Sequence, residues 1–154
     1  MTTAIATLEP QTATTATLPA PLSNLAHNAE LLQKIMNWDF SAEEQRFQKE
    51  FPHEDVAKAS HDFRIFLYLT IADGVSYFIP SFPADHMWHV SLWFTHNWQA
   101  FSMECNNGVF FHHNPMSEAL PEDEAREKLD AIQEACIRHF GSVIIEISDV
   151  VCCS

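Results

Sequence analysis

The spacing of apolar positions predicts three helices in the first half of the chain. Large apolar side chains fall at near-helical intervals over 24–38. A second helix is expected over 41–51, because Ser41 and Glu44 stand in the order of a capping box and a proline follows the segment. The third, over 54–72, carries a broad apolar stripe, which is typical of a helix that packs on several neighbours.

The second half predicts two more helices and two extended pieces. One helix is expected over 83–105, from a proline at its first position to an Asn-Asn-Gly turn. A short extended segment follows near 109–113. Pro121 and the three acids after it mark the start of the last helix, and Gly141 marks its end. The β-branched run 142–151 is either a strand or an extended tail packed on the helices.

These elements predict a mainly α fold, a compact single-domain array of about five helices with the extended segment near 109–113 and a C-terminal strand as one alternative. A length of 154 residues, 47% hydrophobic residues and only three glycines fit one such domain. The Thr/Ala/Pro-rich stretch 1–21 is expected to be a flexible tail. The domain then spans 22–148, and 149–154 is a C-terminal tail with two adjacent cysteines.

The charge distribution narrows the function. A net charge of −13, from 21 acids and 8 bases, argues against nucleic acid and against an anionic membrane surface as partners. No lysine or arginine occurs between Arg64 and Arg126, although several acids do. This stretch is either a solvated acidic face, which a protein partner can contact, or a region of negative potential that favours a cation.

The cysteines and the N-terminal stretch favour a reducing, cytoplasmic location. The four cysteines match no C-x-x-C pair, the first residues lack the features of a secretory signal, and no apolar run is long enough to span a membrane.

Val151 stands where a prenylation box needs cysteine. The tail cysteines therefore serve as buried apolar residues, as soft-metal ligands or as a target that a partner enzyme modifies. The four cysteines of the chain are Cys105, Cys136, Cys152 and Cys153, of which the last two stand in the tail.

Candidate metal ligands gather in the segment 83–115. It holds five of the nine histidines and no lysine or arginine. Positions four and seven apart share a face of a helix, so Asp85, His89 and His96 are expected on one side of the helix over 83–105. An aspartate and a histidine one turn apart suit zinc or ferrous iron. His96 is then an extra ligand or a general base, and the alternative is that all are hydrogen-bonded structural residues.

His112 and His113 supply a second pair of donors. The Asn-Asn-Gly turn can fold this pair back beside the preceding helix. Neighbouring side chains in an extended segment point to opposite sides, so at most one of the two is expected to face Asp85 and His89. One carboxylate with two or three imidazoles makes a metal site that keeps an open position.

The segment 61–115 resembles an uncharacterised family of glycine-rich-domain-like proteins. The resemblance rests on "HDFRIFLYL", "PADHMWH", "FTHNW" and "FFHHNP", in family order and at near-family spacing. It implies that a site is present, and it implies no activity. The positions that match the family pattern are Arg64, Phe66, Leu67, Asp85, Trp88, His89, Thr95, Gly108, His112, His113 and Pro115.

This chain departs from the family pattern at two positions. Trp98 stands in place of the family's tyrosine, and Ser102 in place of its cysteine, while Cys105 follows three residues later. If that cysteine binds a metal in relatives, this protein has either lost the ligand or replaced it with Cys105.

Three hypotheses remain at this point. The first is a small metal-binding protein, with an enzyme that uses the metal as one form of it, whose ligands are Asp85, His89 and His112 or His113. The second is a non-catalytic interaction module that binds a protein partner through the acidic face. The third is a recognition module that presents the Cys152–Cys153 tail for modification.

Overall fold

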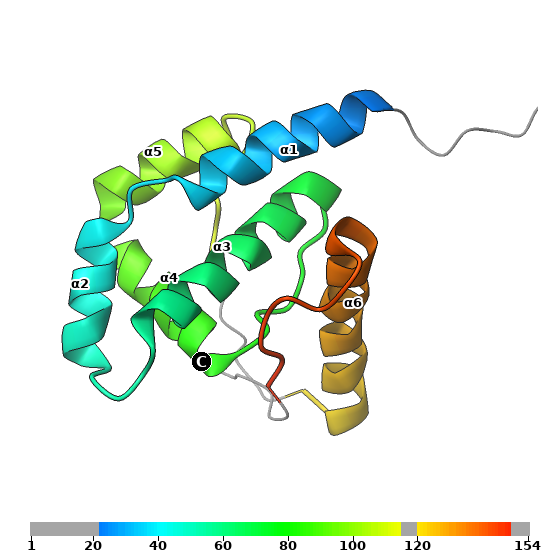
Figure 1. Ribbon diagram of the computed structural model, residues 1–154. Helices are drawn as coiled ribbons and strands as arrows, with labels where there is room; N and C mark the ends of the chain where they lie inside the picture. The colour runs from blue at the N-terminus through cyan, green and yellow to red at the C-terminus, as the bar shows by residue number, and fades with distance from the viewer. Residues whose placement is uncertain (1–21, 115–119, 149–154) are drawn as a thin grey trace, which may run out of the picture.

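The computed structural model describes residues 22–114 and 120–148, which form six helices and no strand (Figure 1). The mainly α fold predicted from the sequence is confirmed. The sixth helix arises because the segment expected as one helix over 83–105 is two. The helices are α1 (Leu22–Met36), α2 (Ser41–Glu50), α3 (Val56–Asp73), α4 (Phe82–Trp93), α5 (Thr95–Cys105) and α6 (Glu122–Phe140).

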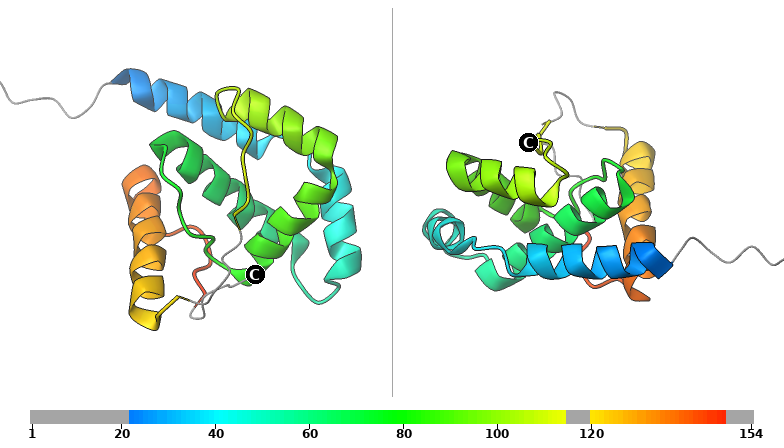
Figure 2. Two further views of the ribbon diagram at one scale, coloured as in Figure 1. Left: turned by 180° about the vertical axis from the view of Figure 1, so that it is seen from behind. Right: turned by 90° about the horizontal axis from the view of Figure 1, so that it is seen from above.

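Helix α3 is the centre of the fold. It contacts α1, α2, α4 and α6, while α5 lies across α1 and α4 (Figures 1 and 2). Every residue from Phe63 to Leu69 is buried, so this helix is enclosed on all sides along that length. The broad apolar stripe in the sequence of α3 is explained by its central position.

An aromatic cluster ties α5 to α3. The rings of Phe63 and Trp98 stack with centroids 6.0 Å apart, and Trp98 stacks on Phe101 at 5.3 Å. Phe40, from the turn before α2, lies 5.6 Å from Phe101. All four side chains are almost fully buried. Removing so much aromatic surface from water fixes where α5 sits on the core.

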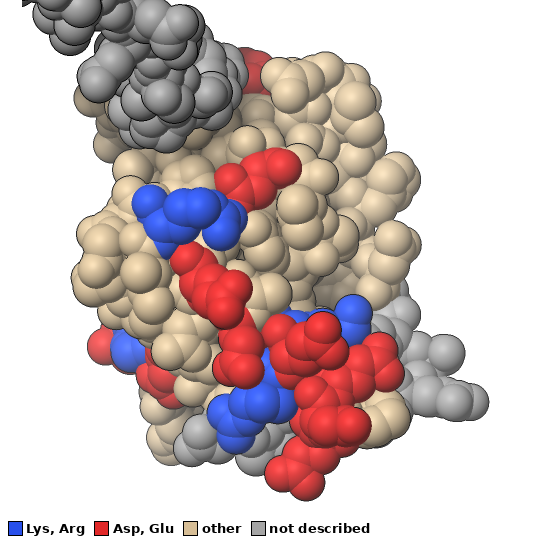
Figure 3. Space-filling model, turned by 90° about the vertical axis from the view of Figure 1, so that its right-hand side faces the viewer, with Lys and Arg blue, Asp and Glu red and all other residues tan. Residues whose placement is uncertain are grey.

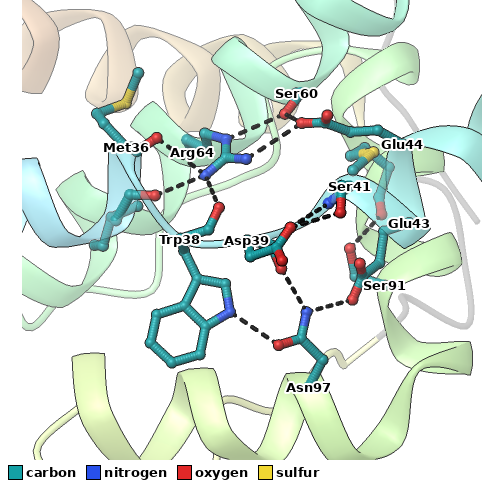
Figure 4. Close-up of polar contacts among 12 residues, drawn as sticks. Met36, Trp38, Asp39, Ser41, Glu43, Glu44, Ser60, Arg64, Ser91 and Asn97 are labelled. Atoms are coloured by element: carbon teal, nitrogen blue, oxygen red, sulfur yellow. Dashed lines mark hydrogen bonds and ion pairs between the residues drawn. The ribbon is translucent and has the colours of Figure 1, made fainter.

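Arg64 holds the end of α1 (Figure 4). Its guanidinium donates to the carbonyl oxygens of Ile35 and Trp38, both at 2.8 Å, and of Met36 at 3.2 Å. Carbonyls in the last turn of a helix lack partners within that helix, and here a buried arginine supplies them. Glu44 balances the charge, because its carboxylate lies 3.2 Å from the guanidinium.

The capping box expected at the start of α2 is absent. Phe40 is the N-cap residue and makes no capping bond through its side chain. The hydroxyl of Ser41 instead donates to Asp39 at 2.6 Å, and Glu44 accepts from Ser60 as well as from Arg64. The buried guanidinium attracts the carboxylate more strongly than a backbone N–H at an exposed helix end.

The prediction of one helix over 83–105 was wrong, because the helix is interrupted at Phe94. Its φ of −96° and ψ of 64° are not helical, and its N–H bonds back to Ser91. The break redirects α5 towards the turn between α1 and α2. There Asn97 accepts from the indole of Trp38 at 3.1 Å and donates to the buried carboxylate of Glu43 at 2.6 Å (Figure 4). These polar contacts, with the aromatic cluster, outweigh the continuity of one helix.

The end of the described chain packs on the helices without forming a strand. Ile145 is buried, the N–H of Glu146 donates to Asp62 at 3.1 Å, and that of Ser148 donates to Pro80 at 2.8 Å. For residues 142–148 the packed tail is therefore the correct alternative. The expected tails 1–21 and 149–154 lie outside the described residues. Across 22–114 and 120–148, no helix is long and apolar enough to cross a membrane.

Candidate metal centre

Helix α4 positions the first two candidate ligands. Ser81 caps the helix by accepting from the N–H of Ala84, and Asp85 follows in the first turn. His89 comes one turn later, with Nδ1 2.8 Å from the backbone oxygen of Asp85 and 3.4 Å from its Oδ2. The backbone contact favours a proton on Nδ1 of His89, so Nε2 keeps its lone pair for a ligand.

His113 completes the group from a distant part of the chain. Its Nε2 lies 3.4 Å from Oδ1 of Asp85, and its ring centroid is 4.5 Å from that of His89. One donor atom from each of Asp85, His89 and His113 lies within 4.8 Å of the other two. The three side chains thus form a site that can hold a metal ion.

The loop before His113 alternates between buried and exposed side chains. Phe111 is buried, His112 is exposed, and the side chain of His113 is 8% exposed. The ring of His112 lies 4.8 Å from that of Phe110, away from the group. The expectation that at most one of the two histidines faces Asp85 agrees with this geometry, and the histidine that does so is His113.

The group is enclosed on one side and open on the other. The side chain of Asp85 is 4% exposed, whereas that of His89 is 35% exposed, so solvent reaches the group past His89. The ring of Trp88 lies 4.2 Å from that of His113 and forms part of the apolar wall. In the part of the chain that the structure describes, Nε1 of Trp88 is buried without a hydrogen-bond partner.

The spacing of the donors fits an ion. Two ligands of a tetrahedral zinc site with bonds of about 2.0–2.1 Å are roughly 3.3 Å apart. Nε2 of His113 and Oδ1 of Asp85, which can both be ligand atoms, are 3.4 Å apart. Charge-assisted hydrogen bonds are usually shorter, at about 2.7–2.9 Å. A carboxylate and two imidazoles at this spacing suit zinc or ferrous iron.

His96 is separated from the group. It lies on α5, beyond the break at Phe94, and its side chain is exposed. The seven-residue spacing from His89 placed it on the same face only for an unbroken helix. Among the described residues, the donors brought together are those of Asp85, His89 and His113, and neither His96 nor His112 is one of them.

Ser102 and Cys105 are both buried, and neither is among the donors that the described residues bring together. The hydroxyl of Ser102 donates to the carbonyl of Trp98 at 2.8 Å. Burial raises the pKa of the Cys105 thiol to about 11, which disfavours the thiolate that binds metals. Cys105 is therefore not a replacement ligand at this centre.

A second polar cluster was not predicted from the sequence. The hydroxyl of Tyr68 lies 3.0 Å from Nδ1 of His139, whose Nε2 is 2.7 Å from Asp73. Asp73 also accepts from Tyr77 at 2.6 Å and from Arg138 at 2.7 Å. The cluster joins α6 to the end of α3. The histidine and the aspartate are 66 residues apart, and no spacing in the sequence relates them.

Comparisons of the chain with models of protein families, with curated proteins and with solved structures find no match.

Proposed function

We propose that this protein binds a divalent transition metal, zinc or ferrous iron, through Asp85, His89 and His113. The observation that carries the proposal is the convergence of one carboxylate oxygen and two ring nitrogens within 4.8 Å. The contact of Nδ1 of His89 with a backbone oxygen supports it, because metal-binding histidines are commonly oriented in this way.

A metal at this centre keeps positions for water or substrate. Three protein ligands leave a zinc ion one position short of four, which is the arrangement of catalytic rather than structural zinc. The partly exposed ring of His89 marks the side from which a small molecule reaches the ion. We therefore propose a metal-dependent enzyme in which the ion polarises a substrate oxygen or activates water.

The acidic surface of α6 supports a second candidate function, the binding of a protein partner. Acidic side chains, drawn red, gather over this helix in Figure 3 beside a few lysines and arginines, and the first turn of α6 alone carries three acids. A basic protein surface is complementary to such a face, and the charges would speed its association. The exposed acids of α6 are Glu122, Asp123, Glu124, Glu127, Asp130 and Glu134.

Adjacent histidines provide the test of the metal proposal. Protein without a histidine tag is reconstituted with zinc, or with ferrous iron under anaerobic conditions, and its metal content is measured after gel filtration. His113→Ala removes the inward-facing ring, and His112→Ala, its matched control, removes an exposed one.

We expect about one ion per chain in the wild type and in His112→Ala, and none retained in His113→Ala. A wild type that retains no stoichiometric ion after reconstitution with either metal contradicts the proposal. The histidines are then structural residues, and the acidic surface of α6 becomes the better candidate for function. Equal retention by the two variants places a bound metal elsewhere.

A further inference from the structure

Both backbone groups of Phe111 are bound by side chains of α5. The N–H of Phe111 donates to the hydroxyl oxygen of Ser102 at 3.1 Å, and its carbonyl accepts from the indole of Trp98 at 3.0 Å. All of these atoms are buried. A buried N–H or C=O without a partner is costly, so the two contacts specify where this residue lies.

The two side chains act as a pair. Ser102 and Trp98 are four residues apart and therefore lie on the same face of α5. The hydroxyl of Ser102 donates to the carbonyl of Trp98. This bond turns the lone pairs of the Ser102 oxygen towards the N–H of Phe111. An extended segment usually satisfies its backbone through a neighbouring strand. Here one donor and one acceptor on a helix do the same for a single residue.

Fixing Phe111 fixes His113. The two side chains are two positions apart and face the same way, as in an extended segment, and the ring of Phe111 is buried 5.6 Å from that of Trp88. The ring of His113 lies 4.2 Å from the same tryptophan. The start of the loop is held separately, because Asn106 donates to the carbonyl of Val109 at 2.9 Å.

We infer that Ser102 and Trp98 are positioning residues of the metal centre, which place His113 against Asp85 through the backbone of Phe111. The inference rests on the proposed function for its effect on metal affinity. In the metal-free protein too, the hydroxyl of Ser102 sets the position of the His113 ring. Ser102 and Trp98 touch no ion themselves.

A matched pair of serines separates positioning from general stability. Ser102→Ala leaves the N–H of Phe111 without its acceptor. Ser91→Ala is the control, because Ser91 is equally buried, on α4, and its hydroxyl makes the same kind of bond to the carbonyl four residues earlier, that of Met87. Ser102→Cys is a second variant that keeps a side chain of similar shape and replaces the hydroxyl with a weak acceptor.

Two measurements are made on each variant. Zinc affinity is measured by competition with a chelator, and we expect it to fall about tenfold in Ser102→Ala and to stay within twofold of wild type in Ser91→Ala. The ring-proton NMR shifts of His113 are measured in the metal-free protein. These shifts are displaced by the nearby ring of Trp88, and we expect the displacement to shrink in Ser102→Ala alone. Ser102→Cys is expected between Ser102→Ala and wild type in both measurements.

Unchanged His113 shifts in a folded Ser102→Ala or Ser102→Cys protein overturn the inference. Equal changes in Ser91→Ala overturn it too, since they would be a general response to losing a buried hydroxyl. The proposed function fails differently, when wild type binds no zinc or iron. In that case the NMR measurement still decides whether Ser102 positions His113.

Discussion

Nε2 of His113 lies 3.4 Å from Oδ1 of Asp85, although the two residues are 28 positions apart. His89, by contrast, is only one helical turn from Asp85 and contacts both its backbone and its carboxylate. The candidate centre therefore has a local half on α4 and a distant half on the loop after α5. The two halves make different demands on the fold.

Asp85→Asn tests the charge at the centre. The change preserves the shape of the side chain and its place in the first turn of α4, but it removes the negative charge of one proposed ligand. We expect zinc affinity to fall by at least about a hundredfold. The metal-free protein should stay folded and lose roughly 1–2 kcal/mol, because a buried carboxylate beside two histidines and a helix N-terminus is neutralised. Calorimetric titration and chemical denaturation give the two quantities, and wild-type affinity in the variant would remove Asp85 from the centre.

His89→Ala tests the local half against a histidine on the same helix. His86 is 31% exposed in its side chain, close to the 35% of His89, but it pairs with Glu54 and stacks on Phe51. We expect His89→Ala to lose the metal while remaining folded, and His86→Ala to retain it. Metal content and a melting curve are measured for both. Metal loss in both variants would indicate that α4 as a whole had been disturbed.

Asp73 should make stability depend on acid pH. Burial acts to raise its pKa, but the hydrogen bonds from Tyr77, His139 and Arg138 outweigh burial and lower it. Because the pKa is lower in the folded state, its contribution is complete above the unfolded value of about 3.9 and is lost as pH falls through the folded value. We expect Asp73→Asn to reduce the fall in the free energy of unfolding between about pH 5 and pH 2. If the free energy of unfolding of the variant fell with acid pH just as that of the wild type does, Asp73 would not be the cause of the pH dependence.

Arg64→Lys tests the buried guanidinium at the end of α1. One ammonium group cannot replace a planar group that donates to three carbonyls and a carboxylate, so we expect a loss of about 2–4 kcal/mol. Arg46→Lys is the control, because its ion pair with Glu50 is on the surface and should be worth less than about 1 kcal/mol. Urea denaturation measures both losses. Similar losses in the two variants would mean that the contacts of Arg64 add little.

The helices could be predicted from the sequence because each buries one face, and a buried face leaves apolar residues at helical intervals. The break at Phe94 could not, since no glycine or proline marks it between Ser91 and Trp98. It arises from distant contacts, in which Asn97 binds the turn before α2 and the ring of Trp98 packs on α3. Tertiary contacts of this kind override helix propensity without leaving a signal in the segment itself.

The candidate centre was also predicted only in part, because some of its residues are placed by local spacing and others by tertiary contacts. The spacing of Asp85 and His89 is local, and the structure keeps it. Alternation limited the adjacent histidines to one inward side chain, but only the burial of Phe111 decides that it is His113. His96 was expected on the shared face, and its place there depended on a continuous helix, which the break at Phe94 interrupts. Contacts between segments decided both outcomes, and a single sequence does not contain them.

The separation of His113 from α4 has a consequence for stability. An ion bound by all three ligands would be a reversible cross-link, closing a chain loop of 28 residues between Asp85 and His113. By the chain-entropy estimate for covalent links, a loop of this length restricts the unfolded chain by about 3–4 kcal/mol. An unfolded chain can still hold the ion weakly through neighbouring residues. The stabilisation would therefore follow mass action, rising with the concentration of free metal and vanishing when a chelator removes it.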